Sequence, residues 1–304
     1  MLNKTTLHSG RYGKMRHRFS SFEIAVFAFL AILAASYLCT VGWGLLSSFK
    51  TYDDFRRNKF GLPTQWDFTN LLYVIKNFSV PTTTSKGLPT TVYIPEMLLN
   101  TVLYVLGCGF VGTIVPFITA YLVMRYPYKL SKVIYVFVIV AMAIPIVGAQ
   151  ASEMRVMITL KLYNTRFGMW LKCGSIISMY FLVMCATFRS IPKALGEAAE
   201  VDGASQMRIM WQIIMPMALN VFGVVFLINC IAFWNEYTSA LLYQPAYPTL
   251  SVGLYSLLRS QDNSMSFVPR RMAACFTLMV PVFILFLIFG DKMMNSLSMG
   301  GVKE

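Results

Sequence analysis

The chain has 304 residues, of which 57% are apolar and only 13% are charged, and its formal net charge is +13. Soluble domains are about 45–50% apolar and about 25% charged, so this composition excludes an ordinary soluble protein. The apolar residues form uncharged blocks, and a membrane-spanning helix needs roughly 20 such residues. The blocks predict an all-α integral membrane protein whose six spans lie near residues 22–47, 97–124, 133–152, 172–189, 217–240 and 272–291.

A basic tail, residues 1–21, opens the chain, and we expect it on the cytoplasmic side of the membrane. The first apolar run is too long for the core of a signal peptide, and no small-residue cleavage site follows it. We therefore expect a retained first span, followed by an outer loop over residues 50–95. Small residues at 107–113 favour close helix packing in the second span. Residues 22–304 are expected to form one six-helix domain.

The orientation of the chain in the membrane is open on charge alone. An even number of spans puts both termini on one side, but the Lys and Arg residues divide evenly between the two sides. Only the basic tail beside the first span favours cytoplasmic termini under the positive-inside rule. A seventh uncharged stretch, residues 237–258, contains Pro245 and Pro248. Because proline interrupts helix hydrogen bonds that lipid cannot replace, we expect an extended or re-entrant loop packed on protein.

The charged interlude over residues 190–216 carries the signals of two short helices joined by a bend. Ser190 and Pro192 are suited to a helix start, and Gly203 can take the left-handed conformation that ends a helix. A second helix is expected after Gly203, and Pro216 is expected to turn the chain into the fifth span. The small side chains on one face of the first helix allow close approach of another surface. That face comprises Leu195, Ala198, Ala199 and Asp202. A surface hairpin that merely joins two spans is the alternative.

The spacing within this interlude resembles the EAA loop in permease subunits of binding-protein-dependent ABC importers. The matching residues are Glu197, Ala198, Ala199, Asp202, Gly203, Ile213 and Pro216. Met215 departs from that pattern, which has Leu there. Four further segments are similar to the MalG-like class of carbohydrate permease subunits: L-Y-N-T-R-F-G-M-W-L (162–171), A-F-W-N-E-Y-T-S-A-L-L (232–242), Y-P-T-L-S-V-G-L-Y-S-L-L (247–258) and the ending M-G-G-V-K-E.

This resemblance implies the type I ABC importer permease fold in a bacterial cytoplasmic membrane, with both termini cytoplasmic. The coupling loop 190–216 would dock on an ATPase dimer, which binds the ATP and Mg, so this chain would hold no cofactor and catalyse no reaction itself. Gly300 and Gly301, in the tail over residues 292–304, would also touch the ATPase. The other implied partners are a second permease subunit, an extracytoplasmic solute-binding protein and a sugar or oligosaccharide, with no nucleic acid.

A polar interruption near the end of the fifth span predicts the cargo path. An ionisable residue in a span is a functional candidate, and aromatic side chains can stack on a sugar ring. The candidates are Trp234, Asn235, Glu236 and Tyr237. A glutamate that simply faces water at the interface is the alternative. The resemblance implies that the outer loop 242–270 reaches the binding protein, and the candidates there are Gln244, Tyr247 and Thr249.

Other chemistry has little support in the sequence. The six cysteines form no C-x-x-C pair and both histidines lie in the tail, which argues against a metal site. No phosphate-binding loop or nucleophile motif is present. An ion-coupled secondary transporter would require inverted repeats and paired intramembrane charges, and we see neither. A permease for a peptide, amino acid or phosphate is the nearer alternative. The basic outer segment favours lipid phosphate, an acidic binding protein or an acidic glycan; it carries Arg155, Lys161, Arg166 and Lys172.

Overall fold

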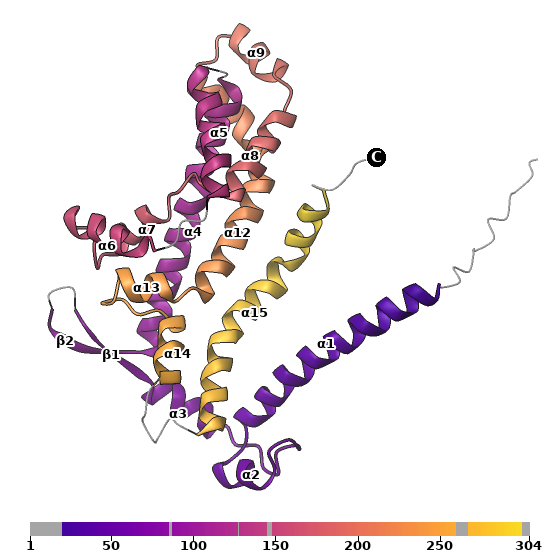
Figure 1. The fold of residues 1–304 in the computed structure, drawn as a ribbon, viewed down its shortest axis with the longest axis vertical. Coiled ribbons are helices and arrows are strands. Elements are labelled where there is room, and N and C mark those ends of the chain that lie inside the picture. The colour runs from indigo at the N-terminus through magenta and orange to yellow at the C-terminus, as the bar shows by residue number, and fades with distance from the viewer. Residues whose placement is uncertain (1–19, 85–86, 127, 145–147, 260–266, 300–304) are drawn as a thin grey trace, which may run out of the picture.

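The computed structural model describes residues 20–84, 87–126, 128–144, 148–259 and 267–299, with several side chains of the last helix left out. The described part is mostly helical, with one two-stranded antiparallel sheet (Figure 1). In chain order the elements are α1 (Ser21–Ser48), α2 (Tyr52–Arg57), α3 (Thr69–Asn77), β1 (Ser79–Thr83), β2 (Pro89–Tyr93), α4 (Ile94–Arg125), α5 (Lys129–Ala143), α6 (Gln150–Thr159), α7 (Arg166–Lys172), α8 (Met179–Ser190), α9 (Ala194–Val201), α10 (Gln206–Arg208), the π-helix η1 (Ile209–Ile214), α11 (Met215–Met217), α12 (Leu219–Asn235), α13 (Thr238–Tyr243), α14 (Leu250–Arg259) and α15 (Val268–Met299).

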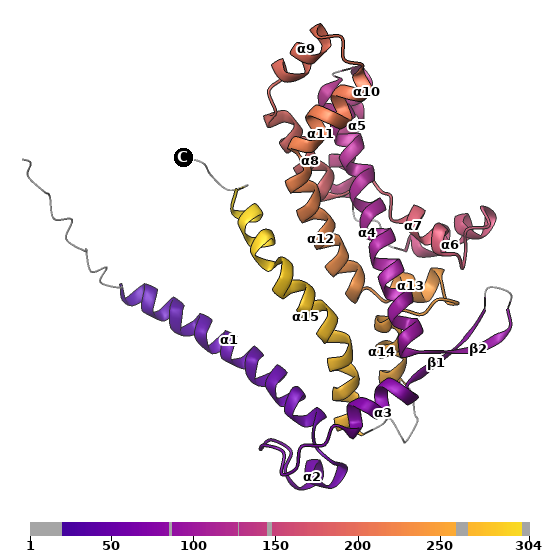
Figure 2. The ribbon, with the colours of Figure 1, turned by 180° about the vertical axis from the view of Figure 1, so that it is seen from behind.

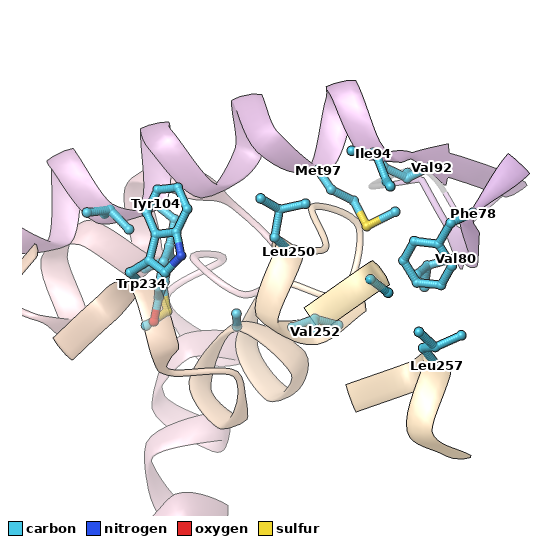
Figure 3. Close-up of a cluster of buried hydrophobic side chains, with 14 of the residues drawn as sticks. Phe78, Val80, Val92, Ile94, Met97, Tyr104, Trp234, Leu250, Val252 and Leu257 are labelled. Atoms are coloured by element: carbon cyan, nitrogen blue, oxygen red, sulfur yellow. The ribbon is translucent and has the colours of Figure 1, made fainter. Parts of the chain in front are cut away.

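Helix α4 is the central element of the molecule, and it packs most extensively on α12 and α8. One end of the body carries α9, α10 and α11, and the other carries α3, α14 and the β1–β2 hairpin (Figures 1 and 2). Each end has its own hydrophobic core. The cluster at the hairpin end joins Phe78 and Met97 to Leu250 and Trp234, so it binds the hairpin, α4, α12 and α14 together (Figure 3). The cluster at the other end is built mainly on α4, α8 and the segment 209–218.

Close packing of α4 depends on its small residues, as the sequence predicted. A methyl group at Gly107 would overlap the indole of Trp170, which instead donates a hydrogen bond to the Leu103 carbonyl at 3.2 Å. A methyl group at Gly109 would lie 3.0 Å from Cys230 Sγ on α12. Near it, Asn229 Nδ2 donates to Thr113 Oγ1 at 2.9 Å between the two helices. In an apolar environment such a paired amide holds the helices in register.

The predicted six spans are confirmed only in part. Among the described residues, α1 and α4 are long and apolar enough to cross a membrane, and a third span results if the bent pair Gln206–Met217 and Leu219–Asn235 is counted as one. The sixth predicted span lies within α15. Helices α5 and α8 have 15 and 12 residues. At about 1.5 Å per residue neither crosses a hydrocarbon core of about 30 Å alone.

The third predicted span, 133–152, is wrong as a continuous helix. Helix α5 ends at Ala143, and α6 begins at Gln150 and runs away from the bundle (Figure 1). Between them Gly148 has φ of +81°, a left-handed conformation that an α-helix does not contain. The fourth prediction, 172–189, also differs, because its helical part starts at Met179 with a Ser178 side-chain cap.

The uncharged stretch over residues 237–258 is not a span, as expected, but it is helical rather than extended. Its two prolines lie between α13 and α14. The segment packs on protein, since Tyr243, Leu250 and Leu257 are buried. The outer loop 50–95 holds α2, α3 and the hairpin, in which Val80 pairs with Val92.

Candidate coupling elbow and cargo cavity

The interlude over residues 190–216 forms an elbow, defined here as α9, α10, η1 and α11. Gly203 ends the first arm with φ of +80°, as its predicted role requires. The second arm bends by 70° into α12 at Ala218, immediately after Pro216 and Met217. The predicted helix start at Ser190 is wrong. Ser190 closes α8 and donates its hydroxyl to the Thr187 carbonyl at 2.8 Å, while Lys193 precedes α9.

The elbow exposes most of the residues that match the EAA pattern. Glu197, Ala198, Asp202, Gly203 and Pro216 are exposed, whereas Ala199 and Ile213 are half-buried. Apolar residues of the elbow pack it onto the body of the protein. Ile209, Ile214 and Met215 lie in the hydrophobic cluster at this end. Large apolar side chains also face outward here: Val201 is 88% exposed, Met207 64% and Trp211 49%. A rigidly seated end with exposed apolar groups is suited to contact with another protein. Gly300 and Gly301 lie outside the described residues.

A cavity of about 400 Å³ lies between α12, α14 and α15. Its walls combine aromatic rings with an amide and a hydroxyl, which is the mixture that suits a sugar. The lining residues are Trp234, Asn235, Tyr237, Ser251, Leu254, Tyr255, Leu258, Cys275 and Met279. Three of the four predicted cargo-path residues are therefore brought together here.

Tyr255 is a cavity residue that the sequence reasoning missed. Its ring stacks on Tyr237 with centroids 4.6 Å apart, and the Arg259 guanidinium lies 4.7 Å from the Tyr255 ring centroid. A usable signal was present, because Ser251, Leu254, Tyr255 and Leu258 fall at i, i+3, i+4 and i+7 along one helix face.

Glu236 does not line this cavity. Its carboxylate accepts the Tyr104 hydroxyl at 3.0 Å and the Ser239 backbone N–H at 2.9 and 3.1 Å. The side chain therefore caps the start of α13 and ties it to α4. This geometry supports a structural role and departs from both the predicted cargo contact and the alternative of a glutamate that faces only water.

The loop that was predicted to contact the binding protein packs against the body of this chain. Gln244 and Thr249 are 2% and 1% exposed, so neither side chain is available to a docked protein. Thr249 Oγ1 instead accepts the Val252 N–H at 3.4 Å, at the start of α14. Tyr247 is half-buried, with the Arg166 guanidinium 4.4 Å from its ring centroid.

Charged groups near this loop are mostly engaged in structure. Glu153 accepts the Tyr243 hydroxyl at 2.8 Å and lies 3.3 Å from Lys172 Nζ. The Tyr243 hydrogen bond and the Lys172 charge lower the pKa of Glu153 against the opposing effect of burial. Burial, and then the Glu153 contact, raises the pKa of Tyr243 to about 12. Arg166 donates to Asn100 at 2.8 Å, so of the predicted basic segment only Arg155 and Lys161 are fully exposed.

No cluster of three or more His, Cys, Asp or Glu residues suited to a metal ion occurs in the described part of the chain. The arrangement as a whole is that of a helix bundle with a protruding elbow at one end and a cavity toward the other. Its functional elements are therefore surfaces for binding and movement.

Comparison with known proteins gives the family. Residues 112–298 match the model of the binding-protein-dependent transport system inner membrane component, and the chain belongs to this family. The chain is 25% identical over 278 residues to the diacetylchitobiose uptake system permease protein NgcG of Streptomyces coelicolor, covering 90% of this chain and 86% of that protein. It is 25% identical over 297 residues to the arabinooligosaccharides transport system permease protein AraQ of Bacillus subtilis, covering 95% and 99%.

The fold also matches a solved structure. The crystal structure of a bacterial ABC transporter involved in the import of the acidic polysaccharide alginate superimposes with a TM-score of 0.75 at 20% identity. The match covers 90% of this chain and 98% of that chain. The type I permease fold predicted from the sequence is thus supported at the level of architecture.

Proposed function

We propose that this chain is one of two permease subunits of a bacterial ABC importer that moves a sugar or oligosaccharide inward. Its family membership carries the proposal, and NgcG and AraQ, which are similar over most of their length, are named as permeases for saccharides. The driving reaction, ATP hydrolysis, belongs to a separate ATPase dimer that binds ATP and Mg.

The elbow is the proposed ATPase contact. Glu197 and Ala198 are exposed on its first arm, beside the 88% exposed Val201. An apolar side chain so exposed at the end of a rigid body is explained by a docked partner. Closure of the ATPase on ATP would move the elbow. ATP drives transport only if the ATPase binds it with different affinity in the two states of the permease. Gly300 and Gly301 remain proposed as a second contact with the ATPase.

The cavity beside Trp234 is the proposed cargo-facing wall. Its lining joins the Trp234 indole to the mutually stacked Tyr237 and Tyr255 rings, with the amide of Asn235 beside them. The Ser251 hydroxyl also lies there and donates a hydrogen bond to the Glu236 carbonyl at 3.2 Å. Sugar rings present one apolar face and a rim of hydroxyls, so this combination suits them. The cavity is lined by α12, α14 and α15, and the second permease subunit would complete the path beside it.

The opposite end of the molecule is the proposed contact for an extracytoplasmic solute-binding protein. The β1–β2 hairpin has open edges, and lipid cannot satisfy the free backbone groups of such edges. The hairpin therefore belongs in water or on protein, at the end opposite the elbow. Thr82 Oγ1 donates to the Pro245 carbonyl at 2.6 Å and joins it to the loop after α13. In this arrangement Tyr247, rather than the buried Gln244 or Thr249, is the member of that loop available for contact.

The exposed apolar surface of helix α1 is an argument for a second membrane subunit. None of its most apolar 18-residue window is buried, whereas Gly44 near its end packs against Met272 and Phe276 of α15. Figures 1 and 2 show α1 leaving the body at an angle, with its start directed toward the elbow side, as is the end of α15. With the elbow in the cytoplasm, this arrangement supports cytoplasmic locations for both termini.

The test is affinity capture of the chain from its native membranes in mild detergent, followed by mass spectrometry. We expect a second permease, an ABC ATPase and a solute-binding protein. The captured binding protein is then screened against glycans, amino acids, peptides and phosphate. If the binding protein binds only a non-saccharide, the proposed saccharide cargo is wrong and the bound class of compound takes its place. Recovery of this chain by itself would contradict the importer and lead to ion-coupled uptake assays.

A further inference from the structure

The C-terminal turn of α4 supports the elbow through a contact that the EAA pattern does not include. Arg125, the last residue of α4, lies against Gly196 of α9. Gly196 is buried, and a methyl group at this position would overlap the Arg125 guanidinium. The same guanidinium donates from Nη1 to the Lys193 carbonyl at 3.3 Å. The first arm of the elbow is therefore seated on the end of α4.

A second contact joins α4 to the other arm. The Tyr126 hydroxyl donates to Gln206 Oε1 at 2.8 Å, and Gln206 Nε2 donates to Glu200 Oε1 at 2.8 Å. Gln206 lies in α10 and Glu200 lies in α9, on opposite sides of the bend at Gly203. This chain of hydrogen bonds fixes the two arms relative to each other and fixes both relative to α4.

The far half of α4 makes a matching set of contacts with the cavity end. Tyr104 binds Glu236, and Thr101 Oγ1 accepts the Leu250 N–H at 2.9 Å. These bonds reach the residue after α12 and the first residue of α14, next to Tyr237 and Ser251, which line the cavity. One continuous helix thus touches the elbow at one end and the cavity's supporting loop toward the other (Figure 1).

We propose that α4 is a mechanical link between the elbow and the cargo cavity, parallel to the covalent connections through α8 and α12, and that Arg125 and Tyr126 are its positioning residues. The proposal rests on the proposed function, since the elbow must move with a bound ATPase. Arg125 acts by shape and hydrogen bonding, because its described contacts are a carbonyl and a glycine. Lysine does not replace it, since an ammonium lacks the planar fork of donors.

The test uses the whole importer complex in lipid nanodiscs, with Mg–ATP and its natively purified binding protein as probes. Basal ATPase activity and its stimulation by the binding protein are measured for equal amounts of assembled complex. We expect Arg125→Ala and Tyr126→Phe each to lower the stimulation at least about fivefold with basal activity kept, because the outer signal no longer reaches the ATPase efficiently. Arg125→Lys is expected to behave like Arg125→Ala. Lys132→Ala is the matched control, since that cationic side chain is exposed on the neighbouring helix α5.

A steric rescue makes the test specific. Gly196→Ala is expected to lose stimulation because its methyl group displaces Arg125. The double variant Gly196→Ala/Arg125→Ala is expected to be no worse than Arg125→Ala alone, since the overlap has gone. Normal stimulation in both Arg125→Ala and Tyr126→Phe, or losses that multiply in the double variant, would overturn the link. A wild-type complex that lacks any stimulation by the binding protein would instead count against the proposed function.

Discussion

Substitution of Glu236 is expected to give clearly different results if its role is structural and if its role is to bind cargo. Its carboxylate accepts one hydroxyl and one backbone N–H, from Tyr104 and Ser239. A hydrogen bond to a charged group contributes about 1.5–3 kcal/mol, and a lost helix cap costs about 1 kcal/mol. Glu236→Ala should therefore destabilise the protein by about 3 kcal/mol. For a chain of 304 residues that corresponds to a drop in Tm of about 5 °C.

The assay is thermal unfolding of the purified complex in detergent, followed by fluorescence. Tyr104→Phe removes one partner and keeps the ring, so its cost should be about half that of Glu236→Ala. In a double-mutant cycle the two substitutions should couple by about 1–2 kcal/mol. If both variants unfold at the wild-type temperature while uptake is lost, the structural reading of Glu236 is refuted.

Three further predictions follow from the geometry. Tyr255→Ala should raise the KM for uptake of the cargo identified by the glycan screen about tenfold, with basal ATPase unchanged; an unaltered KM would exclude this wall from the cargo path. Gly203→Val should strain the left-handed bend by roughly 1–2 kcal/mol and reduce uptake per assembled complex, whereas Gly203→Asn should be milder. The lowered pKa of Glu153 means that its contact with Tyr243 contributes fully above the carboxyl's unfolded pKa and is lost as pH falls through the folded pKa. The protection of α6 amides against hydrogen exchange, corrected for the intrinsic exchange rate, should therefore fall only in acid, and Glu153→Gln should remove that acid dependence.

The parts of the fold that sequence predicted well are those with local causes. The first two spans follow from uncharged runs, and the bends near Gly203 and Pro216 follow from backbone chemistry at single residues. The third span failed for the opposite reason. This stretch is uncharged throughout, so its composition predicted a continuous helix. The left-handed backbone at Gly148, which interrupts the helix, is not visible in the composition.

Contacts between segments that are distant in the chain could not be predicted from one sequence. Tyr104 and Glu236 are 132 positions apart, and nothing in either neighbourhood names the other. The burial of Gln244 and Thr249 has the same origin, since it depends on α4, α14 and the hairpin meeting around them. Part of the cavity could be predicted. Trp234 and Tyr237 were recognisable because they interrupt a span, whereas Tyr255 could be found only from the helix periodicity of the following segment.

The abrupt change from strand to helix at Tyr93 and Ile94 has a consequence for how deeply the chain sits in the bilayer. Because open strand edges cannot enter hydrocarbon, the hairpin would act, in the proposed orientation, as a stop at the outer surface. Helix α4 has 32 residues, a length of about 48 Å, whereas the hydrocarbon core is about 30 Å thick. If α4 stands upright, about 18 Å of it projects beyond the lipid tails. In the proposed orientation the hairpin would thereby set the height at which the elbow stands clear of the inner leaflet, and inserting or deleting one turn in α4 would change that clearance by about 5 Å.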